Sequence, residues 1–332
     1  MSKRGLIYLI FSLIIFSLIM ITSCSQQAEK KNEPIKIGLT GWPGYAYVYI
    51  AQEKGFFKNN NVDVELKLTP QAAENFGWYK NGETDAFLDP LSNAIDANDQ
   101  GIRTKIVYAI DYSDEGDVIV GKSSFASLAD LKGKKIGFEG INSFSHIFVV
   151  ASMQKAGLKE SDYELKNVAA QDVPDLMAKG EIDAGHTWEP AKSMALSQGS
   201  KILAKAGDIP GLIIDVFGVK AELVEKRPDD IRAIIKSMNE AREFFVAHPD
   251  EGLEIMSRGT GIPIEELKSG IAGARQLNLE ENVGAMQQDG SVYNSAKITI
   301  DFYTERGQLS KIPDLSNIID PTFVEGLATG NP

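Results

Sequence analysis

Apolar and polar residues follow two periodic patterns along the chain, one typical of strands and one typical of helices, and the two patterns alternate. Residues 62–68 alternate apolar and charged side chains, which indicates a strand, and residues 71–80 then have helical spacing. Further strands are predicted at 35–39, 85–88, 106–111, 118–120, 135–138 and 182–186, and further helices at 45–54, 143–153, 172–179, 231–247, 251–257, 264–272 and 294–307. Strands that alternate with helices predict an α/β fold with mostly parallel sheets.

Two segments of the chain repeat each other in order and spacing. The string KIGLTG at 36–41 recurs 99 residues later as KIGFEG, and GETDA at 82–86 recurs 98 residues later as GEIDA. One α/β unit used twice predicts two lobes with a ligand cleft between them, the alternative being chance similarity of ordinary strand–helix units. We expect lobe 1 at 35–120 and 220–332 and lobe 2 at 121–219, with hinge crossovers near 120–121 and 219–220.

The N-terminus has the features of an export signal. Lys3 and Arg4 precede an apolar run at 6–21, which is shorter than the roughly 20 residues of a membrane-spanning helix. The single cysteine, Cys24, follows Ile-Thr-Ser, and this string resembles the bacterial lipobox, whose cysteine is lipidated and becomes the new N-terminus. An ordinary signal peptide with an incidental cysteine is the alternative. We expect a signal peptide at 1–23, and a lipidated N-terminus with a flexible tether at 24–34.

Composition narrows the range of functions. The net charge of −12 speaks against nucleic-acid binding. No second cysteine is present to form a disulfide, although we expect the protein to be exported. The length is sufficient for two lobes of ordinary domain size, whose cores need no covalent link.

Candidate ligand-binding residues follow the predicted strands at the ends where α/β sheets place their ligands. Trp42 and Tyr45 follow the first strand, and an aromatic pair there can cover an apolar or cationic ligand; packing within their own lobe is the alternative. Asp89 has the corresponding place after residues 85–88. It is expected to accept a hydrogen bond from a ligand amine, or else to cap the helix that Pro90 begins.

Lobe 2 offers a second group of candidates, Ser143, Phe144, Ser145 and His146, which open a helix after its first strand. Free amide groups and the positive end of the helix dipole favour an anion at such a place. Ordinary serine capping, with His146 packed in the first turn, is the alternative.

Carboxylates near the crossovers are weaker candidates. Asp111 begins an acidic cluster with Ser113, Asp114 and Asp117, and in a solvated loop such a cluster is usually plain surface. Asp215 follows two isoleucines before the second crossover and is also a candidate for the cleft.

Several motifs, taken in order, resemble the substrate-binding proteins of bacterial ABC importers for nitrate, aliphatic sulfonates, taurine and thiamine-type pyrimidine precursors. The matching segments are WPGY at 42–45, then 51–57, 85–87, 127–135, 143–146 and 183–190 with its WEP string. The resemblance covers 35–327 and rests on the order of the motifs. It implies a two-lobed, periplasmic-binding-protein-like fold of type II. Such a protein closes on a solute and delivers it, as a monomer, to a membrane permease and its ATPase.

The resemblance also implies functional residues and a ligand class. It places Trp188 and Glu189 close to the ligand, although a helix start with a packing tryptophan would look the same. Asp89, Asp111 and Glu189 in one cleft would repel nitrate or a simple sulfonate, whereas the helix start at Ser143 favours an anionic group. The set therefore suits a taurine-like zwitterion or a pyrimidine-like heterocycle.

An exported two-lobed enzyme is the alternative function, and a receptor subunit that serves a sensor would look alike in sequence. The three histidines show no metal-ligand spacing, and neither a nucleophile elbow nor a phosphate-binding loop is present. Enzymes among the pyrimidine-forming relatives carry a cysteine-rich motif that this chain lacks. We therefore expect an extracytoplasmic binding protein without catalytic residues, metal or cofactor.

Overall fold

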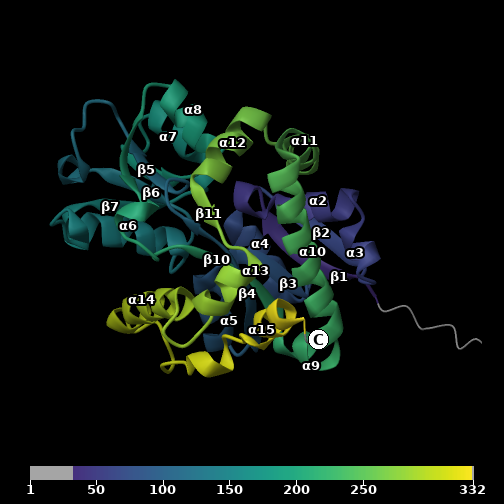
Figure 1. Cartoon of the computed structure of the whole chain (residues 1–332). Coiled ribbons are helices and arrows are strands. Elements are labelled where there is room, and N and C mark those ends of the chain that lie inside the picture. Colours follow the sequence, from purple (N-terminus) through teal and green to yellow (C-terminus); the bar gives the residue numbers. More distant parts are fainter. Residues whose placement is uncertain (1–32, 331–332) are drawn as a thin grey trace, which may run out of the picture. The chain divides into compact units, whose positions relative to one another are not determined.

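A computed structural model describes residues 33–330, and the strands of this part form two separate sheets (Figure 1). The six-stranded first sheet has the order β11-β4-β10-β3-β1-β2 and the five-stranded second sheet the order β7-β6-β8-β5-β9. The strands of the first sheet are β1 (Ile35–Thr40), β2 (Val64–Thr69), β3 (Ala86–Pro90), β4 (Thr104–Ser113), β10 (Ile214–Lys220) and β11 (Ala274–Gln276). Those of the second are β5 (Val118–Gly121), β6 (Lys135–Phe138), β7 (Glu164–Asn167), β8 (Ala184–Thr187) and β9 (Lys201–Lys205).

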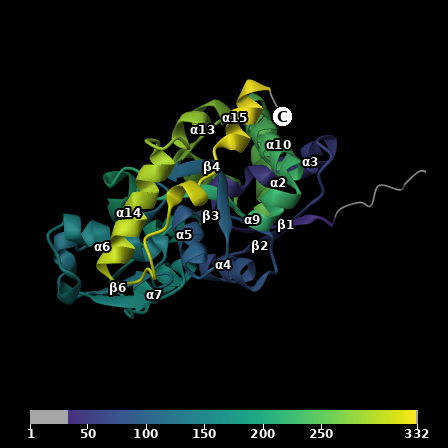
Figure 2. The ribbon, with the colours of Figure 1, turned by 90° about the horizontal axis from the view of Figure 1, so that it is seen from below.

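Helices cover both sheets. The second sheet is packed by α6 (Phe144–Lys155), α7 (Val173–Ala178) and α8 (Ala191–Ser197). Around the first sheet lie α2 (Tyr47–Glu53), α3 (Phe56–Asn59), α4 (Ala72–Asn81), α5 (Leu91–Asp99), α9 (Ala221–Lys226), α10 (Pro228–Ala247), α11 (Pro249–Thr260), α12 (Ile264–Ala272), α13 (Leu279–Ala285) and α15 (Thr322–Thr329). Helix α14 (Ser291–Glu305) lies beside both α5 and α6 (Figure 2), and the Tyr303 hydroxyl donates to the Asn142 carbonyl just before α6.

The sequence repeat corresponds to the same local structure in each sheet. Asp85 accepts a hydrogen bond from the amide of Lys36 at 3.0 Å, and Asp183 accepts the equivalent bond from the amide of Lys135 at 3.1 Å. The glycine of each KIG string lies where side chains of neighbouring elements approach the strand closely. A Cβ on Gly38, for example, would stand 2.3 Å from Asn75 Oδ1. The duplicated α/β plan is therefore confirmed, and its parallel strands are β2-β1-β3 and β7-β6-β8.

Both sheets are mixed rather than mostly parallel, because each includes a strand that directly follows a crossover and runs antiparallel to its neighbours. β10 runs antiparallel between β3 and β4, and β5 runs antiparallel between β8 and β9. The chain thus crosses between the sheets at residues 114–117 and 206–213, earlier than the crossovers expected near 120–121 and 219–220. The apolar strings at these strands suit either sheet, and only the pairing partners decide where the crossing falls.

The two crossovers are tied to each other and to the first sheet. The carbonyl of Gly273 accepts hydrogen bonds from the amides of Asp114, Glu115 and Gly116, at 2.9, 2.9 and 3.0 Å. The amide of Gly207 donates to the carbonyl of Asp114 at 2.7 Å. These bonds give the crossing segments a defined backbone path.

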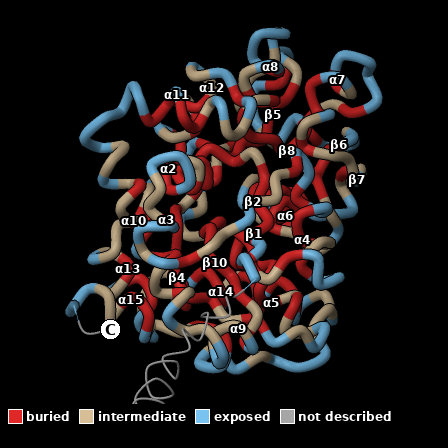
Figure 3. Tube along the Cα trace, turned by 90° about the vertical axis from the view of Figure 1, so that its right-hand side faces the viewer, coloured by how far each residue is buried: buried red, intermediate tan, exposed pale blue. Residues whose placement is uncertain are grey.

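Burial follows the strands. Most positions of β1, β3, β4, β5, β8 and β10 are buried, and the exposed stretches are mainly loops and helix ends (Figure 3). Within residues 33–330, no helix combines the length and the apolar character needed to cross a membrane. The expected lipidation site Cys24, with the rest of the signal and tether up to residue 32, lies outside the described residues.

Candidate functional site

A cavity of about 20 Å³ lies where the two sheets and the two crossovers meet, and we call it the inter-sheet cavity. The first sheet and its helices supply Thr40, Trp42, Tyr45, Ala72, Asp89, Pro90 and Asp215, the crossovers supply Asp117 and Ile213, and the second-sheet side supplies Phe144 and Trp188. Such a volume holds about one water molecule. Six residues predicted from the sequence to bind ligand therefore share one wall: Trp42, Tyr45, Asp89, Phe144, Trp188 and Asp215.

Trp42 is fixed by two glycines and a carboxylate. A Cβ on Gly44 would stand 2.4 Å from the indole Nε1, and a Cβ on Gly116 would stand 2.2 Å from Cη2. The indole nitrogen donates to Asp111, with Oδ1 at 3.3 Å and Oδ2 at 3.2 Å. Only glycine at both places leaves room for the ring, so the first crossover and the loop after β1 together position the indole.

Asp111 and Asp215 form a buried carboxyl pair next to this tryptophan. They are direct partners across the β4–β10 pairing, and the two carboxyl groups influence each other's pKa. Burial raises the pKa of Asp111 to about 6, against the hydrogen bonds from Asp215, Trp42 and Gln276. Burial, followed by the charge of Asp111, raises the pKa of Asp215 well above its usual value.

Tyr45 is a hydrogen-bond partner of this carboxyl pair. Its hydroxyl donates to Asp215 Oδ1 at 2.7 Å. Burial, followed by the nearby carboxylates Asp215, Asp89 and Asp111, raises the pKa of Tyr45 well above its usual value, so the phenol stays protonated and remains a donor. Gln276 Nε2 donates to Asp111 Oδ2 at 2.9 Å from the edge strand β11.

Asp89 is not the helix cap that was the alternative at this position. It belongs to β3, and α5 begins at Leu91 after Pro90, without a side-chain cap. Asn75 donates to Asp89 Oδ2 at 3.0 Å, while Asp89 Oδ1 is buried without a hydrogen bond. Burial raises the pKa of Asp89 well above its usual value, although the side chains of Asn93 and Asn75 act in the opposite direction.

Asp117 is held by a buried chain of polar groups that the sequence analysis did not identify. His186 Nε2 lies 2.8 Å from Asp117 Oδ1, and His186 Nδ1 lies 2.7 Å from Ser145 Oγ. Ser145 Oγ also accepts from the amide of Glu139 at 2.9 Å. The imidazole therefore links Ser145 to Asp117, so Ser145 acts through His186 on a residue of the cavity wall.

The start of α6 is capped from within the chain. Ser143 Oγ accepts from the amides of Ser145 and His146, and His146 Nδ1 accepts from the amide of Asn142. Serine capping by Ser143 is therefore confirmed. The amides of Ser145 and His146, on which an anion site was expected, are thus bonded to Ser143, and of the four candidate residues only Phe144 lies on the cavity wall. Burial, followed by the charge of Arg306, lowers the pKa of His146.

Glu189 is buried but has protein partners on both oxygens. Oε1 accepts from Ser269 Oγ at 2.7 Å and lies 3.0 Å from Lys192 Nζ, and Oε2 accepts from the amide of Ser193 at 3.0 Å. Its neighbour Trp188 lies on the cavity wall, with its ring centroid 5.7 Å from that of Phe144. In the WEP turn, Trp188 therefore lies on the cavity wall, whereas Glu189 does not line the cavity.

Glu139 joins the two sheets. Oε1 accepts from the amide of Ala73 in α4 at 3.2 Å, and Oε2 accepts from the amide of Ala170 on the second-sheet side at 2.9 Å. Sequence reasoning missed this residue and Thr40, which occupies the equivalent position of the first repeat and lines the cavity. The repeat itself was the signal, because the two residues hold the same place at the carboxyl end of the repeated strand.

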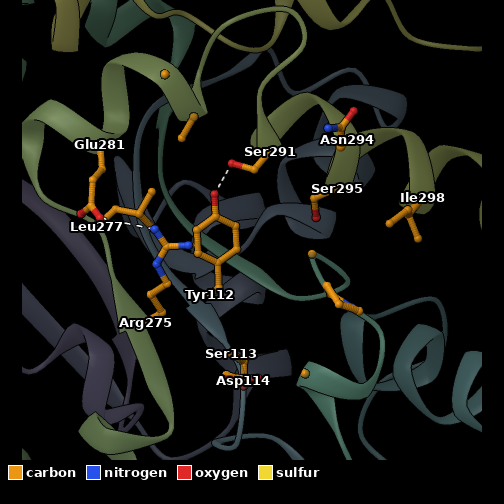
Figure 4. A pocket seen from close by; sticks show the side chains of 15 residues that line it. Tyr112, Ser113, Asp114, Arg275, Leu277, Glu281, Ser291, Asn294, Ser295 and Ile298 are labelled. Atoms are coloured by element: carbon orange, nitrogen blue, oxygen red, sulfur yellow. Dashed lines mark hydrogen bonds and ion pairs between the residues drawn. The ribbon is translucent and has the colours of Figure 1, made fainter.

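A larger cavity of about 670 Å³ lies between the crossovers and the segment β11-α13-α14. Figure 4 shows Tyr112 at its centre, hydrogen-bonded to Ser291, and Arg275 beside Glu281. Of the residues singled out in the sequence, only Ser113 and Asp114 of the acidic cluster line it. Within residues 33–330 no group of three or more histidine, cysteine, aspartate or glutamate side chains has the arrangement of a metal site.

Comparison with known proteins finds a matching family, related sequences and similar solved structures. A family model described as NMT1/THI5 like matches residues 42–252. The taurine-binding periplasmic protein of Escherichia coli K12 is 25% identical over 219 residues, covering 63% of this chain and 67% of that protein. A 4-amino-5-hydroxymethyl-2-methylpyrimidine phosphate synthase of Saccharomyces cerevisiae is 24% identical over 226 residues, covering 62% and 65%. The structure of the alkanesulfonate-binding protein of Xanthomonas axonopodis pv. citri bound to MOPS matches with a TM-score of 0.72 at 16% identity, covering 87% of this chain and 99% of the other.

Proposed function

Because the chain belongs to the NMT1/THI5-like family, we propose that it is the solute-binding protein of an ABC importer, which takes up a small solute in the inter-sheet cavity and delivers it to a membrane permease. The observation that carries the proposal is a single wall built from both sheets and both crossovers. A site of this kind is completed only when the two halves come together, so capture and closure are one event.

The size of the cavity supports a hinged mechanism. About 20 Å³ is far less than an organic solute occupies, so the two lobes, one around each sheet, must part to admit it. The crossovers at 114–117 and 206–213 are the segments that would bend, because they are the connections through which the chain passes between the sheets. The solute is a small nitrogen- or sulfur-containing organic molecule, in keeping with the names of the relatives.

The test places the same bulky side chain in each of the two cavities. Ala72→Phe obstructs the inter-sheet cavity, and Asn294→Phe obstructs the larger cavity. A panel of taurine, sulfonates, amines and pyrimidines is first screened by thermal shift, since a ligand at about 100 times its Kd adds about 2.7 kcal/mol. We expect Ala72→Phe to abolish the shift of any hit and Asn294→Phe to preserve it. The reverse result would move the site to the larger cavity.

An enzyme that acts on a similar small molecule is the second candidate, and it is favoured by the likeness to the yeast synthase. Turnover distinguishes the two. A hit that is recovered chemically unchanged after prolonged incubation supports binding and delivery, whereas a product that forms in proportion to protein concentration supports the enzyme.

The anchor and location are part of the same proposal. Residues 1–23 serve as the export signal and Cys24 carries the lipid, so the monomeric protein works outside the cytoplasm at the membrane surface. Expression of the full chain and of Cys24→Ala in a bacterium, followed by membrane fractionation, tests this. We expect the parent in the membrane fraction and the variant released in soluble form. Equal release of both would contradict lipidation.

A further inference from the structure

The wall of the inter-sheet cavity is acidic. Among the eleven described residues that line it, three are aspartates, namely Asp89, Asp117 and Asp215, and none is lysine, arginine or histidine. All three are at least 97% buried, and Asp111 stands directly behind Asp215 with no exposed surface. Charges buried at such a place need a partner of opposite sign or a proton.

Two basic side chains lie near the cavity without lining it. Lys192 Nζ lies 3.0 Å from Glu189 Oε1 and donates to the Glu115 carbonyl at 3.4 Å. Arg242 lies on the far side of Tyr45, in a separate small cavity with Tyr47 and Tyr108. Neither side chain lines the inter-sheet cavity, so an anionic solute there would meet carboxyl groups without a balancing cation.

One acceptor on the wall is unused. Asp89 Oδ2 accepts from Asn75, and the Asn93 side chain lies near the same carboxyl group, but Oδ1 is buried without a hydrogen bond of proper distance and angle. The other carboxyl groups have partners: Asp117 has His186, Asp215 has Tyr45 and Asp111, and Asp111 has Trp42 and Gln276. A buried acceptor of this kind is satisfied by a donor from the ligand, and a carboxylate prefers a charged N–H donor.

The remaining wall suits a cation as well. Trp42, Tyr45, Phe144 and Trp188 contribute aromatic rings, whose faces attract positive charge. The aromatic rings and the carboxyl groups therefore favour the same sign of charge on the solute.

We infer that the solute of this protein is a small organic cation with N–H donors, such as a protonated amine or amidine, whose N–H group donates to Asp89 Oδ1. The inference rests on the proposed function and gives it a ligand class. Nitrate and simple sulfonates are disfavoured, because no basic side chain lines the cavity to balance their charge, whereas a cation compensates a buried carboxyl group when it ionises. Quaternary ammonium ions bind more weakly, because they have the charge but no hydrogen for Asp89.

Titration calorimetry at pH 7 with the full chain tests the inference, using alkyl and benzyl series that each include the primary amine, the trimethylammonium and the sulfonate. We expect the amine to bind at least tenfold more tightly than the trimethylammonium, and the sulfonate to show no binding. Asp89→Asn keeps the size of the side chain and should lower the amine affinity tenfold or more. Asp301→Asn, an exposed position on α14, removes the same charge and should change nothing.

The outcomes separate the inference from the proposed function. Binding of sulfonates or nitrate in preference to amines would overturn the inference and leave the solute-binding role intact. Unchanged amine affinity in Asp89→Asn would overturn it as well. Failure of every member of both charge classes to bind would count against the solute-binding role itself.

Discussion

Asp111 and Asp215 face each other on neighbouring antiparallel strands, both are buried, and burial raises the pKa of both carboxyl groups. The folded protein therefore binds protons at a pH where the unfolded chain, with aspartate pKa values near 3.9, has released them. The stability that this pair contributes is fully present at acid pH. It falls as the pH rises from about 4 through the raised pKa values.

Asp215→Asn should remove much of this pH dependence. Asparagine can keep an oxygen for the Tyr45 hydroxyl and supply a permanent N–H group to Asp111, as the protonated carboxyl does. We expect the variant to be more stable than the parent at pH 8, because asparagine has no carboxyl group that must keep a proton or be buried as a charge at that pH. At pH 4 the two should be equal. Melting temperatures between pH 4 and 8 provide the measurement.

Asp301→Asn is the control for this experiment, because it removes one exposed carboxylate far from the pair. If the melting temperatures of the parent and of Asp215→Asn changed in the same way between pH 4 and 8, the two carboxyl groups would not share a proton in solution.

Gly116→Ala should destabilise the protein through Trp42. The added methyl group would stand 2.2 Å from Trp42 Cη2, and overpacking of this kind costs about 1–3 kcal/mol. Trp42→Phe removes the atoms that clash, so the double variant should be more stable than the sum of the two single changes. Urea unfolding of all three variants measures the coupling.

Gly77→Ala is the matched control, because its Cβ would meet nothing within 4 Å in helix α4. It should stabilise the protein by about 0.5–1 kcal/mol, the ordinary gain for alanine in a helix. Strict additivity of Gly116→Ala and Trp42→Phe would mean that the ring lies elsewhere.

Glu139→Gln should weaken the contact between the two halves. Glutamine has one oxygen where glutamate has two, so the amide of Ala73 or that of Ala170 loses its acceptor, at a cost of about 1–3 kcal/mol. We expect a larger radius of gyration in small-angle X-ray scattering without solute, and a weaker affinity for any solute that requires closure.

Glu164→Gln provides the comparison for this change. Glu164 pairs with Lys166 on the same strand, so its loss leaves the contact between the halves intact. An equal effect of both substitutions on the radius of gyration would indicate general loosening rather than loss of the Glu139 contact.

Sequence alone determined the features that depend on neighbours along the chain. The repeated strings predicted two equivalent α/β units, because each copy carries its own strand string and its own aspartate, and the two pair in the same way, Lys36 with Asp85 and Lys135 with Asp183. The cap at Ser143 was also predictable, since a serine before an apolar helix bonds the amides of its own first turn.

Tertiary structure alone decided the features that depend on partners far along the chain. Asp89 joined a strand instead of capping a helix, because β10 pairs with β3 across more than a hundred residues. Glu189 is hydrogen-bonded to Ser269 and does not line the cavity. The β4–β10 register places Asp111 next to Asp215 as one acidic pair. A sequence specifies which groups carry charge, but burial and distance determine which of those charges meet, and these are properties of the packed chain.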